Sequence, residues 1–205
     1  FHQALFYQPD CNRTILNIGG IANVTLLAKD AVATAGFDTG PGNTLLDSWF
    51  RKHHAKGFDR NGDWGSSGRL QQPLLDELLA QPYFPQTPPK STGRETFHLE
   101  WLEQVLNRTG SETIRPQDIQ RTLVEFTAAS ITLAIQQYAE NTEQVLVCGG
   151  GIHNHFLMQR LKALLSPRTV ESTEKQGLHP DWIEAVAFAW LAKQTLDGNA
   201  GNLPA

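Results

Sequence analysis

The sequence predicts an α/β domain in which helices cover a mixed β-sheet, and three observations support that prediction. Two apolar stretches, 14–18 and 21–28, are separated by little more than a glycine pair, which is hairpin spacing. Residues 144–148 form a near-continuous apolar run, which is typical of a strand covered on both faces. Residues 117–139 have so broad an apolar arc that this helix must be largely buried, and we expect it to pack against a sheet. Strands that alternate with helices indicate one layered domain.

The composition is that of a folded chain with ordinary charge. Of its 205 residues 40% are hydrophobic and 19% are charged, which argues against disorder. A net charge of −4 and a pI of about 6.0 give no basic field that would attract nucleic acid or an anionic membrane. Two cysteines, Cys11 and Cys148, are too few for a disulfide scaffold, so we expect the cytoplasm. There is no basic signal region and no apolar run of roughly 18 residues.

The remaining elements follow from periodicity and helix breakers. We expect a helix end over 1–8, a strand over 35–38, a helix that opens at Asn43 or Thr44, a polar loop over 57–68, helices over 70–79, 99–106 and 154–165, a weak strand at 169–170, and a last helix over 181–196. The last helix is apolar almost all round, which predicts that it lies in the core.

Three glycine-rich turns, each after a predicted strand, are the main functional signal. They lie at 18–23, 38–43 and 148–151. Glycine lets backbone N–H groups approach an anion without a Cβ clash, and a following helix N-terminus adds partial positive charge. One such turn alone is more simply a tight turn. Three in one domain favour a phosphate or nucleotide site.

Several charged residues near these turns have two interpretations. Asp38 either holds Mg²⁺ through water or forms an Asx turn that shapes its loop. Glu184 either binds a polyol ligand or completes a capping box with Asp181, and the capping box is the favoured interpretation. Lys90 and Arg94 flank a loop that either contacts an anion or is simply solvated, with a slight preference for the solvated loop.

Motifs for other chemistries do not occur. The sequence has no Walker A motif, no H-E-x-x-H, no G-x-S-x-G and no C-x-x-C. His153 and His155 have no cysteine or carboxylate beside them at metal-ligand spacing, so we expect no metal site there.

Five segments together resemble the anhydro-N-acetylmuramic acid kinase family. They are LNIGGIANVTLL (16–27), GFDTGPGNTLLDSW (36–49), PKSTGRETF (89–97), VCGGGIHNHFLMQRL (147–161) and DWIEAVAFAWLA (181–192). The resemblance implies the sugar kinase, actin and heat-shock chaperone ATPase superfamily, in which two ribonuclease-H-like lobes close over ATP. It further implies Mg²⁺, a homodimer, and phosphorylation of 1,6-anhydro-N-acetylmuramic acid at O6. Water attack at C1 opens the anhydro ring, and the product is N-acetylmuramic acid 6-phosphate, an intermediate of peptidoglycan recycling.

The resemblance also assigns roles to residues of this chain. For nucleotide binding it implies Gly19, Gly20, Ala22 and Asn23 at a phosphate turn, Asp38, Gly40, Gly42 and Asn43 facing the phosphates or Mg²⁺, and Gly149, Gly150, Gly151 and Asn154 at the adenosine segment. For Mg²⁺ it implies Asp38, through water. For the sugar it implies Glu184.

Two segments of the family are not found in this sequence. One is the phosphate loop G-T-S-x-D-G-x-D, and the other ends G-G-Q-G-A-P-L and carries an Asp that resembles the catalytic base. We therefore expect residues 1–205 to be the C-terminal lobe of a two-lobe kinase, with no catalytic residue of its own and no activity alone. His98 also departs from the Asn expected there. The alternatives are a non-catalytic nucleotide-binding or interaction module, or a related kinase for another sugar.

Overall fold

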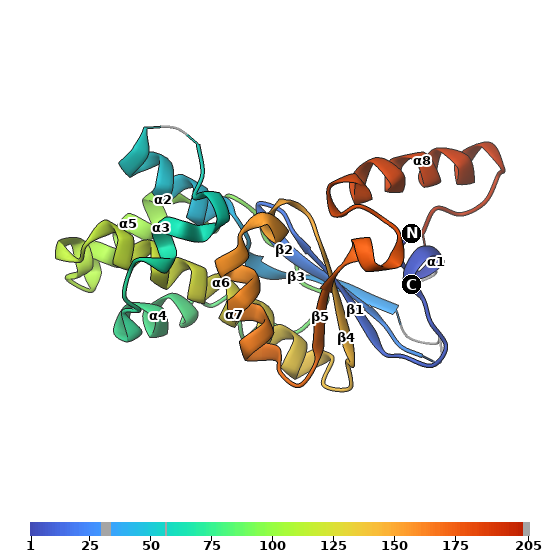
Figure 1. Cartoon of the computed structure of the whole chain (residues 1–205), viewed down its shortest axis with the longest axis horizontal. Helices are drawn as coiled ribbons and strands as arrows, with labels where there is room; N and C mark the ends of the chain where they lie inside the picture. Colours follow the sequence, from blue (N-terminus) through green and yellow to red (C-terminus); the bar gives the residue numbers. More distant parts are fainter. Residues whose placement is uncertain (30–33, 56, 203–205) are drawn as a thin grey trace.

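A five-stranded mixed sheet forms the centre of the molecule (Figure 1). The computed structural model describes residues 1–29, 34–55 and 57–202. The strands are β1 (Arg13–Ile18), β2 (Ile21–Leu27), β3 (Thr34–Pro41), β4 (Gln144–Cys148) and β5 (Thr169–Ser172), in the order β3-β2-β1-β4-β5. β1, β2 and β3 are antiparallel neighbours, whereas β4 is parallel to both β1 and β5. The predicted α/β class with a mixed sheet is confirmed.

The hairpin and the buried strand are also confirmed. Ile18 pairs with Ala22 across the Gly19–Gly20 turn. β4 lies next to β1, and its last four residues are buried. Because β1 and β4 run parallel, the chain must cross over between them, and that connection holds the longest helix. β3 continues to Pro41, three residues beyond its predicted end, because it pairs with β2 as far as Ile21.

Helices cover the sheet and extend beyond it. They are α1 (His2–Phe6), α2 (Thr44–His54), α3 (Asp63–Ser66), α4 (Gln72–Leu79), α5 (Leu99–Arg108), α6 (Pro116–Tyr138), α7 (His155–Leu165) and α8 (Ile183–Leu196). In Figure 1 α2 to α5 form a group around one end of α6, away from α8. No helix in the described part of the chain is both long and apolar enough to cross a membrane.

α6 is buried along most of its length, as predicted, and its polar residues Thr122, Glu125 and Thr132 are buried too. Leu123, Phe126 and Ile131 are at most 1% exposed and belong to the main core, whereas Leu133 is 50% exposed. Glu125 is buried and accepts hydrogen bonds from Arg121, one turn earlier, and from Arg160 on α7. This ion group joins α6 to α7.

The polar stretch 57–68 is not a simple loop. It contains a short 3-10 helix, η1 (Arg60–Gly62), and α3. The buried Asp59 accepts hydrogen bonds from the amides of Trp64 and Gly65 at 2.9 and 2.8 Å. A carboxylate that satisfies these two donors lets a short, glycine-containing helix form despite its low intrinsic propensity.

The prediction that the last helix lies in the core is wrong. Only Ile183 of α8 is buried, and Phe188 is 72% exposed. In Figure 1 α8 stands away from the sheet. The capping box is also wrong, because Trp182 rather than Asp181 precedes the first residue of α8 and makes no side-chain cap. Asp181 instead pairs with His153 at 2.8 Å.

Candidate functional site

The first two glycine turns are bonded to each other through their backbones. The amides of Gly42 and Asn43 donate to the carbonyls of Gly20 and Gly19 at 2.9 and 2.8 Å. The hydroxyl of Thr44 also donates to the Gly20 carbonyl, at 2.8 Å, and the amide side chain of Asn43 donates to the Ile18 carbonyl. Asn43 does precede α2, as expected, but its side chain binds the neighbouring turn and does not cap the helix.

Gly42 is required by this close approach. A Cβ at this position would lie 2.4 Å from the Gly19 carbonyl oxygen and 3.3 Å from the Ala22 amide nitrogen. Any larger residue would therefore push the two turns apart. The turn 18–23 and the start of α2 thus form one continuous wall.

The third turn uses its glycines in two ways. Gly149 has a φ of +80°, and a Cβ on Gly151 would lie 2.3 Å from the Ile18 side chain, so both are needed for the fold. Gly150 is exposed, and the nearest heavy atom to a Cβ there is Asn43 Nδ2 at 3.9 Å. The space next to Gly150 is therefore open toward the other two turns.

A cleft of about 490 Å³ lies where the three turns meet. Its walls are Gly19, Gly20, Asn43, Thr44, Asp47, Ser48, Arg51, Arg94, His98, Leu99, Glu100 and Gly150. A smaller hollow of about 280 Å³ shares Asn43, Asp47 and Gly150 with it and adds Phe58, Asp59, His153 and Asn154. Of the predicted nucleotide residues, the structure brings Gly19, Gly20, Asn43, Gly150 and Asn154 together around these hollows.

The other predicted nucleotide residues support the wall or lie elsewhere. Ala22, Gly40 and Gly42 are buried, and a Cβ on Gly40 would lie 2.9 Å from the ring of Phe84. Asn23 lies opposite Asp38 in the β2–β3 ladder, next to a shift of register. These residues, like Gly149 and Gly151, do not line the cleft.

Asp47 and Arg51 of the cleft were not singled out from the sequence, whereas Arg94 was considered there as a possible anion contact. Asp47 and Arg51 lie one turn apart on α2, with Asp47 Oδ2 and Arg51 Nη1 4.0 Å apart. Burial raises the pKa of Asp47 from its usual value, and the nearby Arg51 opposes that shift. Arg94 reaches the wall from a distant loop, where its guanidinium lies 3.8 Å from the position of a Cβ on Gly20. The only indication of Asp47 in the sequence was its place in the segment 36–49, which resembles the family.

Asp38 ties the 90–95 loop to β3. Its Oδ2 accepts hydrogen bonds from the hydroxyl of Ser91 and the amide of Thr92, both at 2.9 Å. Its backbone carbonyl accepts the hydroxyl of Tyr83 at 2.6 Å. These contacts agree with the interpretation in which Asp38 shapes its loop. Asp38 does not line the cleft. Among the described residues, no cluster of three or more His, Cys, Asp or Glu side chains could hold a metal ion.

The loop over 90–95 is not simply solvated, which corrects the slight preference drawn from the sequence. Lys90 Nζ donates to the Phe84 carbonyl at 3.0 Å and lies over the ring of Tyr83. Burial lowers the pKa of Lys90. With Asp38 and Lys90 fixing the loop, Arg94 is presented to the cleft.

Glu184 lies in a different hollow. This hollow of about 460 Å³ is lined by residues of α1, the sheet and α8, among them His2, Asn17, Thr25 and Glu184. Glu184 is exposed. Burial, with a contribution from the Glu184 charge, raises the pKa of the Cys148 thiol to about 12. Glu184 is therefore a solvent-accessible carboxylate beside the end of β4, and it is separate from the glycine cleft.

We expect Cys148 to resist alkylation in the folded protein. The thiolate is the reactive form, and a pKa of about 12 leaves almost none of it at pH 8. Cys11 is partly exposed and serves as the internal comparison. Mass spectrometry after iodoacetamide treatment should find modification at Cys11 alone in buffer and at both cysteines in denaturant. Equal modification of Cys148 in buffer would contradict its burial.

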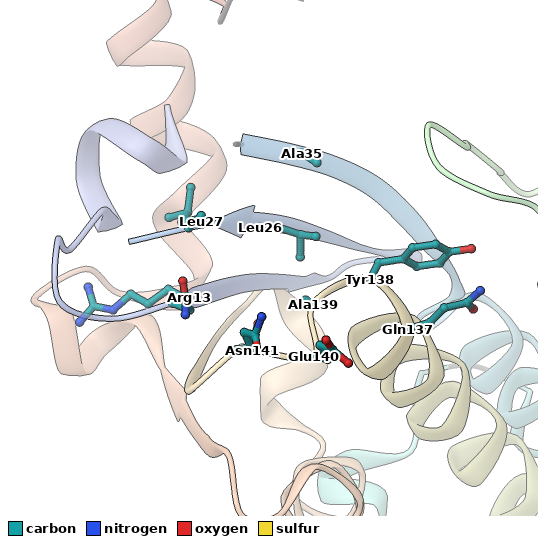
Figure 2. Close-up of a pocket in the computed structure, with 12 residues that line it drawn as sticks. Arg13, Leu26, Leu27, Ala35, Gln137, Tyr138, Ala139, Glu140 and Asn141 are labelled. Atoms are coloured by element: carbon teal, nitrogen blue, oxygen red, sulfur yellow. The ribbon is translucent and has the colours of Figure 1, made fainter. Parts of the chain in front are cut away.

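Figure 2 shows another hollow, of about 470 Å³, at the far end of the same sheet. It lies between the end of β2, at Leu26 and Leu27, and the C-terminal end of α6, at Tyr138 and Ala139. None of the predicted site residues lines it.

Comparison with known proteins identifies the family. The model of the anhydro-N-acetylmuramic acid kinase family matches residues 1–205. The chain belongs to the anhydro-N-acetylmuramic acid kinase family. It is 53% identical over 205 residues to the anhydro-N-acetylmuramic acid kinase of Coxiella burnetii (strain Dugway 5J108-111), covering all of this chain and 54% of that protein. It is 48% identical over 204 residues to the Xylella fastidiosa (strain Temecula1) enzyme, covering 52% of it. The chain thus spans about half the length of these relatives.

A solved structure supports the fold of this family member. The activator of the 2-hydroxyisocaproyl-CoA dehydratase from Clostridium difficile, solved with bound ADPNP, has a TM-score of 0.55 and 16% sequence identity. The match covers 100% of this chain and 69% of the activator. At this identity the likeness concerns the fold, which is that of actin-like ATPases, as the resemblance implied.

Proposed function

We propose that this member of the anhydro-N-acetylmuramic acid kinase family is the C-terminal, ATP-binding lobe of a kinase. The whole enzyme would phosphorylate 1,6-anhydro-N-acetylmuramic acid at O6 and open the anhydro ring with water, giving N-acetylmuramic acid 6-phosphate for peptidoglycan recycling. The observation that carries the proposal is the meeting of the three glycine turns around one cleft. A Cβ on Gly19 or Gly150 there would meet no atom closer than 3.5 Å. The family to which the chain belongs supports the choice of substrate.

The cleft suits the triphosphate of ATP. The backbone amides of Gly42, Asn43 and Thr44, at the start of α2, already donate hydrogen bonds to the carbonyls of Gly19 and Gly20. They therefore cannot bind phosphate as well. We infer that phosphate donors come from the turn 19–20, from Gly150 and from the guanidinium groups of Arg51 and Arg94. The uncrowded position of Gly150 would let the backbone approach the nucleotide closely.

Mg²⁺ belongs to the proposal as the partner of the phosphates. It prefers octahedral oxygen ligands and keeps several waters, so one or two carboxylates plus phosphate oxygens suffice. Asp38 fits only a water-mediated role, because its Oδ2 already holds Ser91 and Thr92. The ion would supply charge neutralisation during phosphoryl transfer. The catalytic base that activates water would come from the part of the enzyme outside this chain.

Other features of the proposal follow from the family and the composition. We propose that the enzyme acts in the cytoplasm, as a homodimer, on small molecules and not on nucleic acid or membranes. The net charge of −4 is consistent with that choice. Glu184 would accept hydrogen bonds from the sugar in the hollow beside α8.

A Glu184→Gln variant of the full-length enzyme tests the sugar contact. Loss of a charged hydrogen bond costs about 1.5–3 kcal/mol, so kcat/KM for the sugar should fall by roughly tenfold to a hundredfold. The KM for ATP should change little. Glu174→Gln, on an exposed 3-10 helix, is the matched control and should behave like wild type. An unchanged kcat/KM in Glu184→Gln would remove Glu184 from the sugar site.

A coupled ADP-release assay with the anhydro sugar tests the function itself. The full-length protein should turn over, whereas residues 1–205 alone should stay at background because they lack the G-T-S-x-D-G-x-D loop and the proposed base. Turnover by the 205-residue chain would contradict the lobe assignment. ATP binding without turnover by the full-length protein would favour a non-catalytic module. Turnover only with a different amino sugar would indicate a related kinase.

A further inference from the structure

α8 presents an apolar face to solvent. Its sheltered side consists of Ile183 together with the half-buried Val186, Ala187 and Trp190. The opposite side carries Ala185, Phe188, Ala189, Leu191, Ala192 and Leu196, all of them exposed, and we name these six residues the outer face of α8. Phe188 is 72% and Leu196 87% exposed. A surface helix normally turns polar residues outward, so a helix that is apolar on both sides is expected to be buried on both sides.

Contacts of Ile183 and Trp190 hold α8 in place. Ile183 packs with Cys148 and Leu146 of β4, and the centroids of the Trp190 and Phe1 rings lie 6.1 Å apart in a tilted arrangement. The segment before α8 is bonded to the third glycine turn, because the Gly149 amide donates to the Pro180 carbonyl at 3.2 Å. The rest of the chain therefore holds α8 through its sheltered side, and the helix stands away from the sheet (Figure 1).

We propose that the outer face of α8 packs against the part of the full-length polypeptide that lies outside these 205 residues. The relatives are about twice as long as the match, since the chain covers 52–54% of them. The full-length polypeptide therefore contains further residues that can pack against the outer face of α8. This inference concerns how two halves of one protein meet, and it is independent of the proposed ATP cleft.

The size of the outer face favours this occupant over a second copy of the chain. Fourteen residues form a helix about 21 Å long. One face of such a helix is far smaller than the roughly 800 Å² per partner of a stable interface between separate molecules. A covalently connected partner needs less area, because its effective concentration is already high. The remainder of the polypeptide is covalently connected to α8, so a small contact area is sufficient.

Photo-crosslinking from position 188 in the full-length protein tests the proposal. Phe188 is replaced by p-benzoyl-phenylalanine, which keeps an aromatic side chain and so preserves the packing. After irradiation we expect a product of monomer mass, with the crosslink mapped by mass spectrometry to a peptide outside residues 1–205. A product of twice the monomer mass would identify a second copy instead. A crosslink inside residues 1–205, or none, would contradict the proposal.

A charge substitution gives a second, independent measurement. Phe188→Glu in the full-length protein should lower the melting temperature by several degrees and increase proteolysis between the two halves. Gln176→Glu is the matched control, because it adds the same charge at an exposed position away from α8 and should change neither measurement. Equal behaviour of the two variants would contradict the docking of the outer face.

Discussion

Replacing Gly150 with valine in the full-length protein should weaken ATP binding by roughly tenfold to a hundredfold. An added isopropyl group forced against a bound ligand costs about 1–3 kcal/mol, which corresponds to that loss of affinity. The fold should be almost unaffected, because Gly150 is exposed, has no left-handed φ, and has no atom closer than 3.9 Å to a Cβ. Calorimetric titration with ATP gives the affinity, and thermal unfolding gives the stability.

A matched control separates binding from stability. Gly110 has a φ of +64° and open surroundings away from the cleft, so Gly110→Ala should cost about 1 kcal/mol through backbone strain alone. That variant should bind ATP like wild type although it is the less stable of the two. Unchanged ATP affinity in a folded Gly150→Val protein would remove the third turn from the nucleotide site.

Glu125→Gln should produce the largest loss of stability, about 3 kcal/mol. Glu125 is buried and binds Arg160 at 2.8 and 3.0 Å and Arg121 at 2.9 Å. Removing its charge leaves two guanidinium groups without their counterion, and breaking a buried pair costs about 3–5 kcal/mol. The lower value applies because the Arg160 side chain is 30% exposed. Urea unfolding measures the change in the free energy of unfolding.

An exposed ion pair is the control for this prediction. Lys52 and Glu103 approach to 2.6 Å, but their side chains are 41% and 38% exposed. Glu103→Gln should therefore cost less than about 1 kcal/mol. Equal losses in Glu103→Gln and Glu125→Gln would show that the Glu125 group does not join α6 to α7 in the way described.

The same carboxylate predicts part of the pH dependence. Burial alone raises the pKa of Glu125, but hydrogen bonds from Arg160 and Arg121 outweigh it and hold the pKa below its usual value. A group with a lowered pKa in the folded state stabilises the protein above its unfolded pKa, and that stability is lost as the pH falls through the folded pKa. Wild type should therefore lose stability below about pH 4.5 more steeply than Glu125→Gln.

The sequence predicted those parts of the fold that depend on local patterns. The spacing around Gly19 and Gly20 predicted the hairpin, and the apolar run 144–148 predicted a strand buried on both faces. The position of α8 was predicted wrongly. An apolar helix sequence indicates that the helix packs against other residues, but it does not indicate whether those residues belong to the same 205-residue chain. The stretch 57–68 was misread because the Asp59 bonds that stabilise α3 depend on the folded loop.

Several glycines of the candidate site were singled out from the sequence, but of its charged residues only Arg94 was considered, as one of two interpretations of its loop. Glycine turns are visible as runs of sequence, so Gly19, Gly20 and Gly150 were identified. The sequence pattern does not indicate which of the glycines face the cleft. That depends on three-dimensional contacts such as the close approach of Gly42 to the Gly19 carbonyl. Arg94 reaches the cleft only because Asp38 and Lys90 fix a loop far away in the sequence.

Hydrogen exchange of the full-length protein with and without ATP and Mg²⁺ tests the central claim most directly. If the three turns form the nucleotide cleft, ATP should slow exchange in the peptides that contain 18–23, 43–48 and 149–154, and Gly150→Val should remove that protection. Peptides around Tyr138, at the hollow shown in Figure 2, should not change. Protection confined to the Figure 2 hollow, or no protection at any of the three turns, would contradict the account.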